Sequence, residues 1–205
     1  MMVTRKTLFE NPHAAHRMDC IAGVDETGRG PLAGPVAAAA VILDPFDMPE
    51  GIGDSKKLTE SARNIAFEAI LKQARAVSFA LLPPLDIDQL NIRGATLEAM
   101  RRAVAGLSIR PQLVLVDGKD IPHGLPCPAR AIIGGDATEP AIGAASIVAK
   151  VMRDRLMIRL GTDLPAYGFE IHKGYGTVRH RAAILEAGGT RHHRRSFAPF
   201  KNGTP

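Results

Sequence analysis

Apolar runs separated by glycine- and proline-rich turns mark the predicted strands of this chain. Residues 21–24 and 36–43 are two such runs, and the wide Gly/Pro-rich turn between them predicts an antiparallel hairpin. The run at 36–43 is continuous rather than alternating, which indicates a strand that is covered on both faces. Residues 76–82, 113–116 and the short segment 131–133 complete the predicted strands.

Apolar residues at helical spacing occupy the segments between and after these strands. Residues 60–75, 91–106, 139–160 and 178–187 are predicted helices, and Thr59 is the predicted N-cap of the first. Turn by turn, the first helix carries Ile65, Ala69 and Lys72, and the third carries Ile142, Ala145, Ala149, Met152 and Leu156 on one stripe. The order of strands and helices predicts an α/β fold with a mixed sheet flanked by helices.

The pattern also predicts how the chain is divided. A layered α/β domain is expected over residues 17–160, followed by a small helical C-terminal part over 161–198. Residues 1–16 and 199–205 lack a clear pattern and are predicted to be loose termini.

Composition limits the class of protein. The 205 residues are 45% hydrophobic but only 4% aromatic, so the core must consist of aliphatic side chains. The net charge of +5 suits a polyanionic partner and equally an ordinary basic protein. The run at 36–43 is far shorter than the about 20 residues that span a bilayer, so no membrane association is expected. Cys20 and Cys127 have no metal-site spacing and suit reduced thiols in a cytoplasmic protein.

Carboxylates follow three of the predicted strands. Asp25 and Glu26 end the first, Asp117 ends the fourth, and Asp136 follows the fifth after two glycines. Because loops at strand ends converge on clefts in α/β folds, these acids are expected to meet. An all-oxygen ligand set selects Mg²⁺ or Mn²⁺ rather than zinc. Two such ions, about 3.5–4 Å apart, can stabilise the attacking and leaving oxygens of phosphodiester hydrolysis.

Each acid also has a purely structural interpretation. Asp117 precedes a glycine, as a turn residue does, and Asp136 could cap the helix predicted from residue 139. Asp25 and Glu26 are harder to explain in this way, because adjacent carboxylates in a partly dry site repel each other and favour protonation. A bound cation removes that cost, so the coincidence of all three positions favours a metal site.

A longer motif surrounds the first two acids. Residues 23–36 read GVDETGRGPLAGPV. Further short motifs follow in order: DSKKL at 54–58, NI at 91–92 with AT at 95–96 and AM at 99–100, VDG at 116–118, GD at 135–136, ASIVAK at 145–150 with RD at 153–154, and HKGYGT at 172–177 with His180. Taken together and in this order, they resemble the type 2 ribonuclease H family, bacterial ribonuclease HII, over residues 21–197.

The resemblance implies a ribonuclease H-like fold and a divalent-metal-dependent endoribonuclease. Such an enzyme hydrolyses the RNA strand of RNA–DNA hybrids and cuts at single ribonucleotides embedded in duplex DNA, as in ribonucleotide excision repair. The implied products carry 5′-phosphate and 3′-OH ends. Residues 17–160 would then form the catalytic domain, with residues 161–198 completing the substrate cleft. A monomer is expected.

The resemblance also implies roles for individual residues. The metal-binding catalytic acids would be Asp25, Glu26, Asp117 and Asp136. Gly28, Arg29 and Gly30 would contact the ribose 2′-OH and its phosphates, and Tyr175 would pack against the next sugar. Further candidates for nucleic-acid contacts are Ser55, Lys56, Ser146 and Lys150. For the two lysines a solvated surface charge, and for Ser146 a small packing residue, remain open alternatives.

The C-terminal histidines and arginines are less specific. His172 and His180 have no cysteine near them, which argues against a structural zinc. His172 could protonate a leaving group or hold the loop that carries Tyr175. The basic run 191–195 could touch a nucleic-acid backbone, but is predicted to be a solvated tail. The proline-rich segment 121–130 matches nothing that can be assigned.

Two other classes of function stay open on the sequence. A non-catalytic binder of hybrid duplexes would share the basic charge and the glycine-rich turn, but it gives no reason for four acids at strand ends. The other class is a metal-dependent nuclease of another specificity, such as a DNA junction resolvase, which an uncut all-DNA substrate beside a cut ribonucleotide substrate would exclude.

Overall fold

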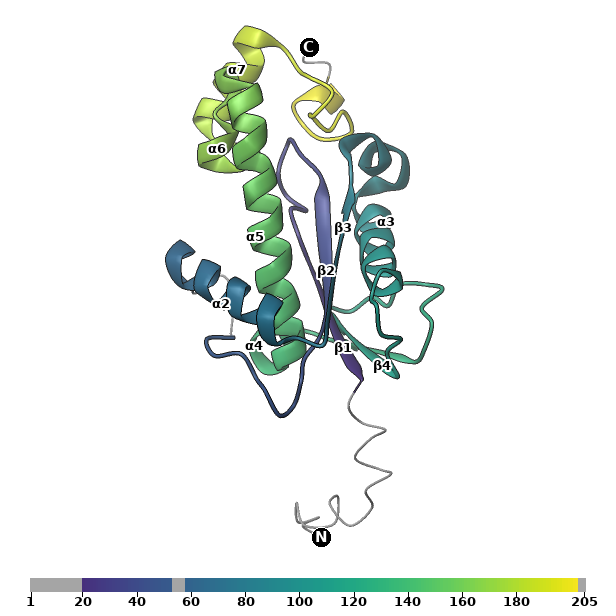
Figure 1. Ribbon diagram of the computed structural model, residues 1–205. Coiled ribbons are helices and arrows are strands. Elements are labelled where there is room, and N and C mark those ends of the chain that lie inside the picture. Colours follow the sequence, from purple (N-terminus) through teal and green to yellow (C-terminus); the bar gives the residue numbers. More distant parts are fainter. Residues whose placement is uncertain (1–19, 53–57, 203–205) are drawn as a thin grey trace, which may run out of the picture.

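A five-stranded mixed sheet forms the centre of the molecule in the computed structural model, which describes residues 20–52 and 58–202 (Figure 1). The strands are β1 (Ile21–Thr27), β2 (Val36–Ile42), β3 (Ala76–Leu82), β4 (Leu113–Asp117) and β5 (Ala129–Ile132), in the order β3-β2-β1-β4-β5. β1 pairs with β4, and β4 with β5, in parallel; the other pairs are antiparallel. The predicted hairpin and mixed sheet are confirmed.

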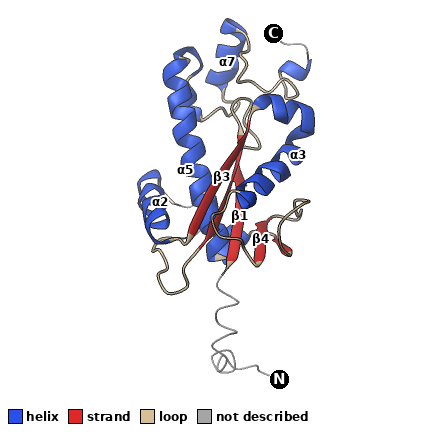
Figure 2. Ribbon diagram, turned by 45° about the vertical axis from the view of Figure 1, so that its right-hand side comes forward, coloured by secondary structure: helices blue, strands red, loops and turns tan. Residues whose placement is uncertain are grey.

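Helices cover both faces of this sheet (Figure 2). They are α2 (Glu60–Gln73), α3 (Pro84–Ala105), α4 (Gly135–Thr138), α5 (Pro140–Asp163), α6 (Phe169–His172) and α7 (Val178–Ala187), with 3-10 turns at Pro165–Tyr167 and Phe200–Asn202. α3 packs on one face, and α5 with α2 on the other. Every residue of β2 is buried, which explains its continuous apolar run.

The longest helix, α5, is buried on all sides over its first half, residues 142–149. Small side chains there let the helix lie close against β1 and β2. Of the predicted stripe, Ile142, Ala145 and Ala149 are buried, whereas Leu156, further along, is 38% exposed. α5 therefore provides a rigid wall behind β1.

The helix predicted over residues 91–106 differs from the observed one. α3 begins at Pro84, not at residue 91, because proline is well tolerated in a first helical turn. Asn91, with φ 56°, interrupts it, and its side chain accepts hydrogen bonds from the N–H groups of Arg93 and Gly94. The sequence pattern thus detected only the second segment of α3.

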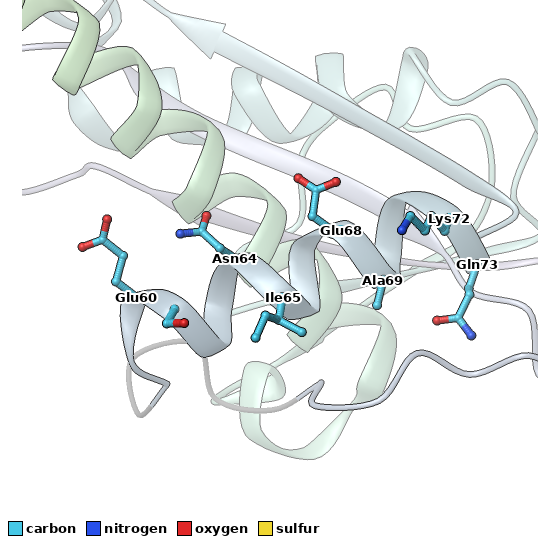
Figure 3. A pocket seen from close by; sticks show the side chains of 8 residues that line it. Glu60, Asn64, Ile65, Glu68, Ala69, Lys72 and Gln73 are labelled. Carbon is cyan, nitrogen blue, oxygen red and sulfur yellow. The ribbon is translucent and has the colours of Figure 1, made fainter.

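The helix α2 keeps its predicted N-cap, since the Ala62 N–H donates to Thr59 Oγ1 at 3.2 Å. Its buried side carries Ala66, Phe67 and Ile70. The residues that suggested helical spacing, Ile65, Ala69 and Lys72, line an open hollow on the outer side (Figure 3).

The C-terminal helices assemble around the far end of α5 (Figure 1). Their small core is made of Leu32, Ala33, Met157, Tyr167, Phe169, Ala183, Ile184 and Phe200. Phe200 is only 8% exposed, so the prediction of a loose terminus is wrong for residues 199–202, because an aromatic ring there completes this core. Residues 1–16 and 203–205 lie outside the described part of the chain. The predicted boundary between residues 160 and 161 falls inside α5.

Candidate metal centre

Strand register brings the carboxylates of β1 and β4 together. Val24 pairs with Val116 in the parallel β1–β4 ladder, and the next residues are Asp25 and Asp117. Glu26 follows Asp25, and one carboxylate oxygen from each of the three acids lies within 4.8 Å of the others. Carboxylate oxygens at this spacing suit a hard divalent cation.

Asp25 is the most buried of these acids, at 4% exposure. Burial raises the pKa of its carboxyl well above the usual value, and the charges of Glu26 and Asp117 add to the effect. Hydrogen bonds with the Ser146 side chain and with the Glu26 N–H, at 2.7 Å, act in the opposite direction and lower this pKa. A cation bound among the acids would favour the ionised form.

Asp136 lies beside this group but is not part of it. It is 9% exposed and sits in the short helix α4. The preceding residue, Gly135, donates its N–H to Asp117 Oδ1 at 2.8 Å, so α4 is tied to the acid on β4. The structure thus brings three of the four predicted acids together, and the role of Asp136 stays a prediction.

The glycine-rich loop after β1 borders the acids. Arg29 Nη1 lies 3.2 Å from Glu26 Oε1. Gly28 has φ +83°, and a Cβ there would lie 2.1 Å from Arg153 Nε, so only glycine fits. Arg29 and Gly30 are exposed.

Tyr175 reaches the same surface from the turn after α6. Its side chain is 46% exposed. The nearest atom to a Cβ built on Gly30 is Tyr175 Cε1, at 3.7 Å. Residues that are far apart in the sequence therefore form one continuous surface of loop, acids and aromatic ring.

The remaining candidates for nucleic-acid contacts have different surroundings. Ser146 is buried at 4% exposure and holds Asp25, so its position favours support of the acid over direct contact with a duplex. Lys150 pairs with Asp154 at 2.6 Å on α5. Ser55 and Lys56 lie outside the described residues.

Cationic side chains flank the acids on the α3 side. A polar pocket there is lined by Glu26 and Asp117 together with Arg29, Arg93 and Lys119. Such a mixture of metal-type ligands and cations suits a phosphate backbone next to the acids. None of these residues lines the hollow on α2.

Histidines fix the backbone around Tyr175. His172 Nδ1 accepts a hydrogen bond from the Gly174 N–H at 3.2 Å, and Nε2 lies 2.7 Å from the Tyr167 carbonyl. Both ring nitrogens are therefore engaged, which supports the loop-holding role over leaving-group protonation.

A second pair of histidines continues this support. Thr190 N–H donates to His193 Nδ1, His193 Nε2 lies 3.1 Å from His180 Nε2, and His180 Nδ1 lies 2.9 Å from the Tyr175 carbonyl. These partners fit two neutral rings that pass one hydrogen bond to the next. His193 and Arg194 are 1% and 0% exposed, so the solvated-tail prediction for 191–195 is wrong at both residues.

Acidification is expected to destabilise the fold through His193. Burial, with the nearby His180 as the next cause, lowers the pKa of His193 from 6.5 to about 4. Between about pH 4 and pH 6.5, His193 is therefore protonated in the unfolded chain and neutral in the folded chain. The contribution of this group to stability is complete above pH 6.5 and falls by about 3 kcal/mol by pH 4.

Urea unfolding at several pH values measures this effect. The pKa of Asp25 is raised, so acidification changes the free energy of unfolding through Asp25 in the opposite direction. The effect of His193 is therefore isolated by comparing wild type with His193→Gln. The free energy of unfolding of this variant should depend less steeply on pH. His123→Gln, at an exposed position, should keep the wild-type slope. Equal slopes for all three proteins would contradict the prediction.

Comparison of the sequence with known proteins matches the chain to one family. The sequence profile described as Ribonuclease HII matches residues 22–200. Ribonuclease HII of Mesorhizobium japonicum is 56% identical over 196 residues, covering 95% of this chain and 85% of the relative. Ribonuclease HII of a Chelativorans species is 58% identical over 182 residues, covering 88% and 72%.

A solved structure gives the same result for the fold. Ribonuclease H2 from Pyrococcus horikoshii superposes with a TM-score of 0.75 at 26% identity, over 89% of this chain and 95% of that one. The expected ribonuclease H-like α/β fold is thereby confirmed.

Proposed function

Because the chain belongs to the ribonuclease HII family and is therefore a hydrolase with ribonuclease H-type endonuclease activity, we propose that it also cuts at single ribonucleotides embedded in duplex DNA. The proposed products carry 5′-phosphate and 3′-OH ends. The observation that supports this substrate is the contact of Arg29, in the exposed glycine-rich loop, with Glu26 of the acidic cluster. The glycine-rich loop would then contact the ribose while the acidic cluster acts on the phosphate, and the two would lie within one nucleotide of each other.

The acidic cluster fits a divalent cation. Its donors are all carboxylate oxygens, and burial together with the charges of Glu26 and Asp117 raises the pKa of Asp25, a cost that a bound cation would remove. We propose Mg²⁺ or Mn²⁺, held by Asp25, Glu26 and Asp117, with Asp136 as a further ligand. When bound, such an ion stabilises the negative charge that develops on the phosphate.

The residues of the chain then bind and orient the substrate. The loop from Gly28 to Gly30 would approach the ribose closely, because two of its residues lack side chains. The 2′-OH distinguishes RNA from DNA at such a site. Tyr175 would pack on the adjacent sugar. Arg93 and Lys119, which line the polar pocket, and Lys150 on α5 would contact phosphates without reading bases.

The alternatives from the sequence are less well supported. A non-catalytic hybrid binder conflicts with membership of a hydrolase family and leaves the acids unexplained. A DNA junction resolvase conflicts with the same membership. Among the described residues no helix is long and apolar enough to cross a bilayer. A monomeric state and a cytoplasmic location stay predictions.

A cleavage map on a duplex with one ribonucleotide tests the proposed function. In Mg²⁺ or Mn²⁺, cutting is expected beside the ribonucleotide, with the proposed end groups, and the matched all-DNA duplex should stay intact. Equal cutting of both duplexes would show that the 2′-OH is not read. Cutting of a long hybrid alone would limit the activity to that substrate.

Replacing Tyr175 by alanine is expected to weaken cleavage at the embedded ribonucleotide. Loss of an aromatic contact with a base typically costs about 1–3 kcal/mol, and a loss of similar order, roughly 10- to 100-fold in rate, is expected for packing on the sugar. The Mn²⁺ concentration for half-maximal activity should not change, since Tyr175 is not among the acids. Phe46→Ala removes another exposed ring, 89% exposed, and should have no effect. Unchanged preference for the ribonucleotide in Tyr175→Ala would contradict the role.

A further inference from the structure

Among the described residues, two arginines are almost completely buried. Arg153, on α5, is 1% exposed, and Arg194, after α7, is 0% exposed. Within the described residues neither forms a salt bridge. A buried cation without such a partner is costly, so these side chains require an explanation.

Backbone carbonyls accept the hydrogen bonds of both guanidinium groups. Arg194 donates from Nη2 to Gly28 at 2.5 Å, from Nη1 to Arg29 at 2.8 Å and from Nε to Gly34 at 3.0 Å. Arg153 donates to the carbonyls of Pro35 at 2.9 Å, Lys173 at 3.1 Å and Ala33 at 3.3 Å. The two side chains therefore hold both ends of the loop 28–35 and the turn before Tyr175.

The contacts of Arg194 determine which side of this loop faces outward. In a planar trans peptide the C=O and the next N–H point in opposite directions. The carbonyls of Gly28 and Arg29 point inward to Arg194, so the N–H groups of Arg29 and Gly30 point away from it. Both residues are exposed, so the loop presents two successive donors on the outer side, next to Glu26.

We propose that Arg194 is a positioning residue for ribonucleotide selection, because it fixes the peptide orientation of the loop that meets the sugar. This proposal rests on the proposed function above. Arg194 acts through the loop, since it is buried and does not itself reach the substrate.

The chemistry of arginine fits this role better than a general packing role. Only a planar guanidinium supplies donors in a fixed fork to three separate carbonyls; lysine offers a single ammonium. Burial lowers the pKa of Arg194 to about 9, so the charge is retained at neutral pH at a cost. The Phe197 ring lies 5.1 Å from the guanidinium carbon and covers it from another side.

The test replaces Arg194 by lysine, which keeps the positive charge but lacks the planar set of guanidinium N–H donors. The substrate is the duplex with one ribonucleotide, under single-turnover conditions and well below the melting temperature. The rate should fall by about 10- to 100-fold, as is typical when an outer supporting contact is removed. Affinity for the all-DNA duplex and the Mn²⁺ dependence should stay at wild-type values. The amide ¹⁵N signals of Arg29 and Gly30 should shift.

Arg110→Lys is the matched control. Arg110 also donates to a backbone carbonyl, that of Pro126 at 2.8 Å, but it is exposed and precedes β4 at the end opposite Asp117. This variant should cleave like wild type.

The outcomes separate the two proposals. If wild type does not cut the ribonucleotide duplex, the proposed function fails, and the amide signals alone decide whether Arg194 orients the loop. If wild type cuts and folded Arg194→Lys cuts equally fast with unshifted amides, the positioning role is wrong. If Arg194→Lys does not fold, Arg194→Gln is measured in the same way; failure of both to fold would make Arg194 a purely structural residue and overturn the proposal.

Discussion

Asp25→Asn is expected to abolish cleavage while the metal-free protein becomes no less stable. The change removes one charged oxygen from the three-acid cluster but keeps the shape of the side chain. Even supporting contacts of metal ligands typically contribute about 10- to 100-fold, so loss of a ligand itself should exceed about 100-fold in rate. The amide oxygen of the variant side chain would still accept hydrogen bonds from Ser146 and from the Glu26 N–H.

Although Asp25→Asn should lose activity, its metal-free form should not lose stability. Burial and the charges of Glu26 and Asp117 disfavour the ionised Asp25. Without metal, the melting temperature of the variant should therefore equal or exceed that of wild type at neutral pH. A cation that binds only the folded state stabilises it by about 2.7 kcal/mol at 100 times its Kd. Added Mn²⁺ should raise the melting temperature of wild type but not of the variant.

Asp163→Asn is the control, since that carboxylate is exposed near the end of α5 and 3.9 Å from Arg159. It should leave both cleavage and the Mn²⁺ response unchanged. Wild-type cleavage by Asp25→Asn, or an undiminished Mn²⁺ response, would remove Asp25 from the metal site.

Gly23→Ala is expected to destabilise the fold by more than about 3 kcal/mol, the range of severe overpacking. A Cβ on Gly23 would lie 2.0 Å from the carbonyl carbon of Ala141 and 2.2 Å from the Ile142 nitrogen. These are backbone atoms at the start of α5, so no side chain can move to make space. The helix itself would have to leave β1.

Urea unfolding measures this loss as a lower midpoint with an unchanged slope. Gly30→Ala is a matched control for stability, because its Cβ would meet only the Tyr175 ring at an ordinary 3.7 Å. Displacement of α5 would also draw Ser146 away from Asp25, so any folded fraction of Gly23→Ala should cleave poorly. An unchanged midpoint would show that α5 can adjust at little cost.

The acids and the sheet were predictable because each depends on local pattern. Apolar runs that end in Asp25 and Asp117 mark neighbouring strand ends, and parallel pairing then places the two acids side by side. The kink at Asn91 was not predictable, since a residue with positive φ leaves little trace in hydrophobic spacing. The role of Gly23 was hidden for a similar reason, because the pattern does not show which helix crosses a strand.

The basic run 191–195 shows most clearly what could not be predicted from the sequence alone. Arg194 and Arg195 are identical in type and adjacent, yet one is fully buried and the other exposed. Only the tertiary structure supplies the carbonyls of Gly28, Arg29 and Gly34 that make burial of the first one possible. Charge patterns alone favour solvent for both.

The contact between the first strand's loop and Arg194 also has a consequence for biosynthesis. Gly34, in the loop 28–35, is synthesised 160 residues before Arg194. Until Arg194 has emerged, the carbonyls of Gly28 and Arg29 lack their partner, although β1 to β4 and their acids are already present. A nascent chain would thus carry the candidate metal ligands before the orientation of the loop 28–35 is fixed. The loop would therefore reach its final conformation only after Arg194 has emerged.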